Sequence, residues 1–198
     1  MVTTAGRRYS RATLMALILM LTSAAPGARD LPDVPGAGPG DVWLMVDTTA
    51  LTLSLMQGNE TLLSYENIAI GSQGATWNKR NGDEKTPLGD FRINEIRPSE
   101  RFTLFLSLDY PNMNHAERAL EEGRIDSGEY QRIEKARSAG APPQDTQLGG
   151  HLGIHGLGLG DPEIHEQVNW TNGCIALTNE QVEDLAARIN RGTVVRIR

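Results

Sequence analysis

The sequence predicts a mainly β fold with a helical insertion and one C-terminal helix. Short apolar segments, some alternating at a period of two, are separated by turn residues over most of the chain. Helical composition is confined to one internal stretch, 113–147, and to one capped segment near the end. Residues 41–198 are enough for one domain with its own core, and the sequence contains no internal repeat.

The first 28 residues have the three-part layout of a secretory signal peptide. Arg7, Arg8 and Arg11 stand without any acidic residue, an apolar run follows, and small residues close the segment. Because the apolar run is short for a membrane span, we predict a cleaved signal peptide at 1–28 and export to the periplasm or the medium. Residues 29–40 are rich in proline and glycine and are predicted to form a linker.

The charge of the chain argues against two classes of partner. Its formal net charge is −6, and removal of the three leader arginines would make it −9. Nucleic acids and anionic membrane surfaces repel a chain of this charge. We therefore expect no nucleic-acid binding, and no membrane association after signal cleavage.

Five strands are predicted in the first half of the domain, at 41–50, 51–56, 61–70, 85–93 and 102–108. The turn residues 57–60 join the second strand to the third, so the first three form an antiparallel meander. The polar, glycine-rich stretch 71–84 is predicted to be a loop.

The second half begins with the helical insertion at 113–147. Its two helices are predicted at 114–122 and 127–138, broken at Gly123. A strand is then expected at 148–154, a long loop at 157–170, a capped helix at 179–189 and a closing strand at 193–197.

The stretch 149–178 holds the only cysteine and three of the four histidines. A lone cysteine in an exported chain is inert and buried, paired between molecules, or kept as a reactive thiol. Gly173 lets the backbone approach a substrate and leaves an amide free for a developing oxyanion. We predict that Cys174 is a nucleophile with an accessible thiol of low pKa, and that His155 accepts its proton.

Four further residues are predicted to bind the substrate: Trp170, Thr171, Asn172 and Tyr110. Thr171 and Asn172 offer small hydrogen-bonding side chains beside the cysteine. Trp170 fits the wall of a cleft and a core aromatic about equally well. His115, His151 and His165 are interpreted as histidines without a catalytic role.

A zinc site is the main chemical alternative, because His151 and His155 are four residues apart and His165 and Cys174 follow. The glycines around both histidines argue against a helix, and in a strand four residues separate side chains by roughly 13 Å. We therefore expect no metal and no cofactor. Taken one at a time, each residue also has a simpler interpretation: Cys174 as an inert thiol in the core, and His155 as a histidine with only a structural role.

The segments Ile154-His155-Gly156 and 170–179 (WTNGCIALTN), with 85–91 (KTPLGDF) upstream, resemble the L,D-transpeptidase catalytic domain family (YkuD-type). The resemblance runs from about residue 41 to the C-terminus. It implies an L,D-transpeptidase-like β-sandwich or barrel, with Cys174 as nucleophile and His155 as base. A backbone carbonyl near Gly156 is implied to orient the imidazole.

The same resemblance implies peptidoglycan stem peptides as substrates, and a role in cell-wall biogenesis and cell shape. An acyl-enzyme would form at the L-to-D bond of a tetrapeptide. An amine would resolve it, cross-linking the wall or attaching a wall-linked protein. Water would resolve it instead in an L,D-carboxypeptidase or amidase.

Two features depart from the family pattern. Many members carry arginine where this chain has Ala176, which leaves the choice between transfer and hydrolysis open, and the insertion at 113–147 is longer than a simple lid. Functions of two other classes remain as alternatives: a zinc peptidase acting on wall peptides, and a non-catalytic wall-binding domain.

Overall fold

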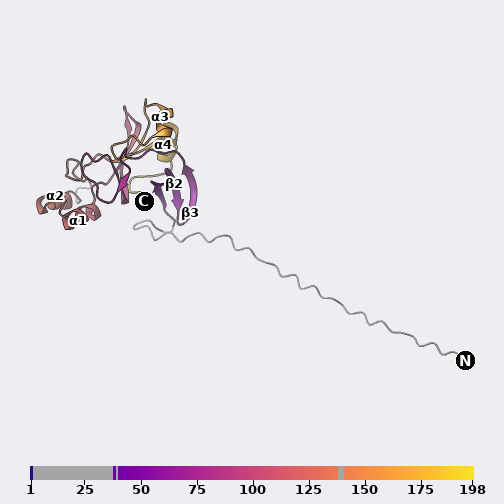
Figure 1. Ribbon diagram of the computed structural model, residues 1–198, viewed down its shortest axis with the longest axis horizontal. Helices are drawn as coiled ribbons and strands as arrows, with labels where there is room; N and C mark the ends of the chain where they lie inside the picture. The colour runs from indigo at the N-terminus through magenta and orange to yellow at the C-terminus, as the bar shows by residue number, and fades with distance from the viewer. Residues whose placement is uncertain (2–37, 39, 138–140) are drawn as a thin grey trace. The chain divides into compact units, whose positions relative to one another are not determined.

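The computed structural model describes residues 1, 38, 40–137 and 141–198, and Figure 1 draws the others in grey. The expected signal peptide at 1–28 and most of the expected linker at 29–40 therefore lie outside the described residues, apart from the terminal Met1. The description below concerns the unit that contains residues 40–198.

An eight-stranded mixed sheet forms the framework, with the strand order β3-β2-β1-β10-β6-β7-β8-β9. Neighbouring strands are antiparallel except for the parallel pairs β1–β10 and β8–β9. The strands are β1 (Val42–Asp47), β2 (Thr52–Gln57), β3 (Glu60–Tyr65), β6 (Gly89–Ser99), β7 (Thr103–Leu108), β8 (Gly153–Gly156), β9 (Ile175–Leu177) and β10 (Val194–Ile197). The mainly β prediction is confirmed.

The first three strands form the predicted meander. Gly58, with φ 55°, makes the turn between β2 and β3, a conformation that favours glycine. The third strand is shorter than the predicted 61–70 because the backbone turns at Asn67, with φ 57°. Ala69 then forms an isolated bridge with Ala176 on β9, so the end of the predicted strand contacts the far edge of the sheet.

A long hairpin, β6 with β7, follows a two-stranded ladder of β4 (Ala75–Thr76) and β5 (Thr86–Pro87). The first arm continues to Ser99, six residues beyond the predicted end at residue 93. Phe91 and Ile93 are buried, whereas the outer part of the arm is largely exposed. The exposed part lacks an apolar pattern because it is stabilised by pairing with β7 instead of by burial.

The insertion contains α1 (Met113–Glu121) and α2 (Ser127–Arg137), which pack against each other (Figure 1). The side chain of Asn112 caps α1, and Gly123, with φ 65°, follows its end. Ala119 and Ile133 are buried in the main core. The two predicted helices are confirmed, and both pack on the domain through narrow apolar faces.

Two short helices lie away from that pair in Figure 1: α3 (Pro162–Gln167) and α4 (Asn179–Ala186). The predicted loop 157–170 contains α3, which begins with the Asp161 cap followed by proline, a start signal that the sequence reading missed. The predicted capped helix at 179–189 is present as α4, which a capping box of Thr178 and Gln181 opens, but it ends at Ala186, three residues before the predicted end. In the part of the chain that the structure covers, no helix is both long and apolar enough to cross a bilayer.

Candidate active site

His155 and Cys174 come together because β8 and β9 are parallel neighbours. His155 lies in β8 opposite Ala176, and Cys174 immediately precedes β9. The prediction had no strand after the cysteine and began the histidine strand at residue 148, whereas β8 begins at Gly153. Both side chains line one cavity of about 580 Å³. The pairing therefore brings together two residues that are distant in the chain.

The His155 ring is fixed on both its face and one edge. It stacks on Phe102 with 4.0 Å between ring centroids, and Nδ1 lies 2.8 Å from the Gly156 carbonyl oxygen. Because a carbonyl only accepts, Nδ1 carries the hydrogen, and Nε2 of the neutral ring carries a lone pair. The expected orienting carbonyl at Gly156 is thus observed, and the ring is in the tautomer that a general base requires.

Burial lowers the pKa of His155 to about 4, although the hydrogen bond to the Gly156 carbonyl acts in the opposite direction. The side chain is only 2% exposed, and the cost of placing a charge there favours the neutral ring. At neutral pH the imidazole is therefore uncharged and able to accept a proton.

The Cys174 thiol differs from the predicted low-pKa thiol. Burial raises its pKa to about 11, although a backbone hydrogen bond from Gly153 and the charges of Lys79 and Arg101 lower it in part. Its Sγ lies 3.6 Å from the His151 carbonyl oxygen, in the direction of a weak S–H donor. The resting sulfur is thus a thiol in the cavity that the neutral His155 ring also lines, and the predicted low pKa of Cys174 is wrong for this structure.

The turn before the cysteine is held by its own hydrogen bonds. The Gly173 amide donates to Thr171 Oγ1 at 3.1 Å, and Thr171 Oγ1 donates to the Cys174 carbonyl at 2.7 Å. The Gly173 amide is therefore already bonded, contrary to the expectation that it would be free for an oxyanion. Thr171 is buried, so it positions the turn.

Close packing explains why glycine stands beside both residues, at Gly173 and at Gly156. At Gly173, φ is 123° and a Cβ would lie 2.6 Å from the Lys85 carbonyl oxygen. At Gly156, a Cβ would lie 2.7 Å from the Phe102 carbonyl oxygen. Either position would force the backbone apart if it carried a side chain.

Three of the four residues predicted to bind the substrate line the cavity: Trp170, Thr171 and Asn172. The half-buried Trp170 meets His155 edge-on with 5.8 Å between ring centroids, and its Nε1 donates to His165 Nδ1. Tyr110 is the exception. It is 1% exposed in the core, and its hydroxyl donates to the Leu148 carbonyl at 2.8 Å, so its predicted contact with substrate is wrong.

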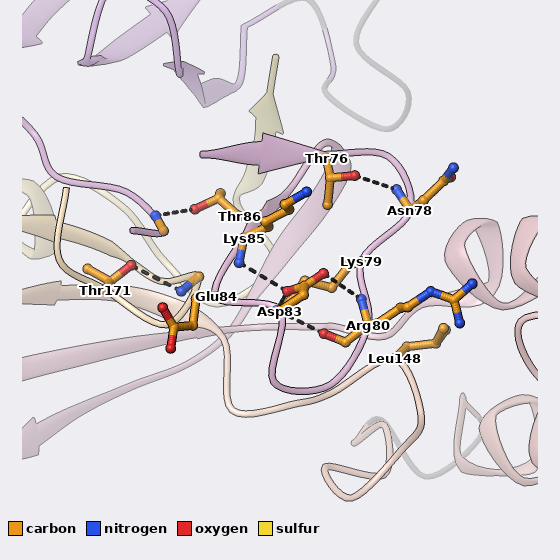
Figure 2. A network of polar contacts seen from close by, with 12 residues as sticks. Thr76, Asn78, Lys79, Arg80, Asp83, Glu84, Lys85, Thr86, Leu148 and Thr171 are labelled. Carbon is orange, nitrogen blue, oxygen red and sulfur yellow. Dashed lines mark hydrogen bonds and ion pairs between the residues drawn. The ribbon is translucent and has the colours of Figure 1, made fainter. Parts of the chain in front are cut away.

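The stretch 71–84, predicted to be a loop, contains the short strand β4 and forms part of the cavity wall. Figure 2 shows its hydrogen bonds: Asp83 accepts from the amides of Arg80 and Lys85, and it forms an ion pair with Lys79. Lys79 is 4% exposed and lines the cavity. Lys79 was not predicted as a site residue, and neither were the cavity residues of the β6–β7 hairpin: Arg97, Ser99, Arg101, Phe102 and Phe105.

The histidines considered as zinc ligands lie in different settings. His151 is exposed ahead of β8 with φ 54°, whereas His165 is buried in α3 and bonded to Trp170. Within residues 40–137 and 141–198, no three or more His, Cys, Asp or Glu side chains are arranged to hold a metal ion. The described geometry therefore offers no ligand set for the zinc alternative.

Comparison with known structures identifies the fold. Pgp2, a helical cell shape determining protein from Campylobacter jejuni, superposes with a TM-score of 0.50 at 18% identity, over 83% of this chain and 52% of that one. Bd1075 from Bdellovibrio bacteriovorus gives 0.51 at 18% identity, over 80% and 48%. At such identities the likeness concerns the fold, and this chain spans about half the length of either protein.

A catalytic domain of an Enterococcus faecium L,D-transpeptidase is also similar, with a TM-score of 0.46 at 14% identity over 80% of this chain and 97% of that one. No curated protein sequence matches the chain. The family model of the YkuD L,D-transpeptidase catalytic domain matches residues 41–197, which is most of the chain. The chain therefore belongs to the L,D-transpeptidase catalytic domain family.

Proposed function

We propose that this protein is a cysteine acyltransferase acting on peptidoglycan stem peptides. The observation that carries the proposal is the shared cavity in which the Cys174 thiol lies with the His155 imidazole, whose Nδ1 is bonded to the Gly156 carbonyl and whose Nε2 has a lone pair. A thiol and an oriented base lining one cleft are the parts that acyl transfer through a thioester requires. Family membership supplies the substrate class.

The first half-reaction follows from the resting protonation states. Nε2 of the neutral His155 takes the thiol proton as Sγ attacks the scissile carbonyl, because a thiol with a pKa of about 11 is almost fully protonated at neutral pH. The imidazolium then donates that proton to the departing amine as the C–N bond breaks. A thioester on Cys174 and a free amine result.

The oxyanion formed during attack needs N–H donors. The Gly173 amide can serve only by giving up its bond to Thr171 Oγ1, which measures 3.1 Å. That exchange replaces a neutral acceptor with an anionic one, and hydrogen bonds to charged acceptors are the stronger. We therefore assign Thr171 the role of holding the turn until the substrate arrives.

In the second half-reaction an amine or water attacks the thioester. Ala176 is fully buried, and its backbone exchanges hydrogen bonds of 3.0 and 2.8 Å with Ala69. Residue 176 therefore provides no charged group to hold an acceptor against competition from water. We propose that hydrolysis, giving tripeptide, accompanies transfer to a wall peptide or to a wall-linked protein.

The site of action belongs to the same proposal. Peptidoglycan lies outside the cytoplasmic membrane, and residues 1–28 have the composition of a secretory signal. We propose that the signal is cleaved and that the domain acts in the periplasm or outside the cell. An intact Met1 on exported protein, measured by mass spectrometry, would contradict this part.

The decisive experiment is mass spectrometry of purified muropeptides after incubation with protein that lacks residues 1–28. We expect cross-linked products and tripeptides with the unaltered protein, and neither with Cys174→Ser. Activity that is lost with a chelator and restored by zinc would favour the metallopeptidase. Binding of wall peptides without any product, together with an unreactive thiol, would favour the non-catalytic wall-binding domain.

A further inference from the structure

We infer that Arg101, assisted by Arg97, binds a carboxylate of the substrate at the rim of the cavity. The inference rests on the proposed function and narrows its substrate class to peptides that carry an ionised carboxylate close to the scissile bond. The recognition is assigned to the β6–β7 hairpin, which was predicted only as two strands.

The first observation is the charge of the cavity. Its lining includes three cations, Lys79, Arg97 and Arg101, and one carboxylate, Glu84. Glu84 already accepts a hydrogen bond from the Ser72 hydroxyl at 2.6 Å. The cleft is thus locally cationic in a chain whose formal net charge is −6, which is the arrangement that concentrates an anionic ligand at one place.

The second observation is that the three cations differ in whether a carboxylate already balances their charge. Lys79 is 4% exposed and forms an ion pair with Asp83, so its charge is already balanced. Arg97 lies 3.5 Å from Glu95, but both side chains are more than half exposed, and such pairs are weak. Among the residues that the structure describes, no carboxylate lies within ion-pair distance of Arg101. Arg101 is the cation of the cavity that is available to a ligand.

The third observation concerns how the two guanidinium groups are held. The Arg101 guanidinium carbon lies 4.8 Å from the centroid of Phe102, and Phe102 stacks on His155. The Arg97 guanidinium carbon lies 5.1 Å from the centroid of Phe105, which also stacks on His155 at 6.0 Å. A guanidinium that rests on a ring keeps its N–H edges free for a planar carboxylate. Each arginine is therefore preorganised beside the base.

The chemistry of the substrate fits this position. In a tetrapeptide donor, the residue that leaves carries the C-terminal carboxylate, only one residue from the carbonyl that Cys174 attacks. A bidentate contact with Arg101 would place that carboxylate and so fix the scissile bond against the thiol. Arg97 would add charge and assist where the carboxylate is displaced toward the outer hairpin.

The test compares a tetrapeptide ending in a free carboxylate with the same peptide ending in an amide. In the unaltered protein we expect a preference for the carboxylate, measured as kcat/KM. Arg101→Gln should lower kcat/KM for the acid by about 10-fold or more, mainly through KM, and leave the amide almost unchanged. Arg97→Gln should have a smaller effect in the same direction, and Arg101→Lys should restore part of the loss.

Arg118→Gln is the matched control, because Arg118 lies 5.1 Å from the centroid of Trp77 in a similar stack but lines a different pocket. It should leave the acid-to-amide ratio unchanged. Thermal unfolding of each variant checks that the exposed Arg101 is dispensable for folding.

Binding of both peptides to Cys174→Ala, with and without Arg101→Gln, is measured by calorimetry, because this readout does not depend on turnover. Loss of the preference for the acid with Arg101→Gln supports the inference even if no product is ever formed, in which case only the proposed function fails. Equal binding of acid and amide by Cys174→Ala, or an equal loss of both with Arg101→Gln, overturns it.

Discussion

Two histidines of this chain are buried in similar surroundings and yet differ in what they can do. His155 and His115 each stack on a phenylalanine, and burial lowers the pKa of each to about 4. His115 has both ring nitrogens occupied: Nδ1 lies 2.7 Å from Asn112 Oδ1 and Nε2 lies 3.1 Å from the Leu88 carbonyl oxygen. Among the residues that the structure describes, His155 has a hydrogen-bond partner only at Nδ1, the Gly156 carbonyl.

The difference shows that burial and a lowered pKa do not by themselves mark a catalytic histidine. Because a neutral imidazole has one N–H, it can satisfy only one of the two acceptors around His115, and it has no nitrogen left to offer a substrate. In His155 the hydrogen bond of Nδ1 instead keeps the hydrogen on Nδ1, so that Nε2 carries the lone pair. His155 therefore differs from His115 in two ways. Its Nε2 is left to accept a proton, and its ring lines the same cavity as the Cys174 thiol.

The largest effect expected from this comparison is on catalysis. His155→Gln keeps a polar side chain of similar length but removes the base, so we expect acylation of Cys174 by a stem peptide to slow by about 10²- to 10⁴-fold. Rapid-quench mass spectrometry of the acyl-enzyme measures this step directly. An acylation rate within a few-fold of the unaltered protein would show that another group takes the proton.

The same substitution at the other histidine is the control, and its effect should be on stability. His115→Gln removes a buried ring that packs on Phe91 and contacts Asn112, so we expect a loss of about 1–3 kcal/mol in the free energy of unfolding. Acylation by the folded protein should be unchanged. Chemical denaturation followed by circular dichroism measures the loss.

Histidines with a pKa lower in the folded than in the unfolded chain also make stability depend on pH. The folded state excludes the proton, so its stability is complete above about pH 6.5 and falls as the pH drops toward 4. His115→Gln should flatten that decline. A decline of unchanged steepness would mean that His115 is not among the groups responsible.

The pH dependence of the chemistry sharpens the comparison further. Because the proposed base is neutral His155 with a pKa of about 4, kcat/KM should remain high down to about pH 5 and fall only below it. Iodoacetamide reacts with the thiolate, whose fraction rises as the pH approaches about 11, so alkylation should be slow at pH 7 and accelerate with pH. Fast, pH-independent alkylation between pH 6 and 8 would instead indicate a preformed thiolate–imidazolium pair.

Most of the fold could be predicted from the sequence because its signals are local. The apolar alternation of β2, the Asn112 and Thr178 caps and the break at Gly123 are written in adjacent residues. By contrast, β9 has three residues, Ile175–Leu177, and it exists because β8 lies parallel to it and Ala69 bridges its other side. Three residues are too few to show the alternation of apolar and polar residues that predicts a strand, so β9 could not be predicted from its own sequence.

The site shows the same division. The sequence predicted Cys174 and His155 as a pair from their types and neighbours, and the family resemblance implied the orienting carbonyl near Gly156 that the structure contains. Burial is the main cause of the His155 pKa shift, and Phe102 and Phe105, which stack on its ring, are distant from it in the chain. Burial also raises the pKa of Cys174, so the expected low thiol pKa was wrong. Tyr110 was misplaced for the same reason, since its core position is set by Leu148.

The smallest expected effect comes from the aromatic ring beside the base. Phe102→Leu removes the ring that stacks on His155 at 4.0 Å and supports Arg101. Without the ring, water reaches the imidazole more easily, and the Arg101 guanidinium no longer rests on a ring beside it. Because burial and the Arg101 charge both lower the pKa of His155, each change raises that pKa from about 4 toward its ordinary value. The pH below which kcat/KM falls should therefore rise by a fraction of a unit.

Phe91→Leu is the control, because it makes the same change beside His115. It should lower the unfolding temperature and leave the pH dependence of kcat/KM unchanged. If both variants shift the pH dependence of kcat/KM equally, the pKa of His155 is set by the whole core rather than by the ring in contact with it. The difference between the two histidines would then not be explained by their immediate neighbours.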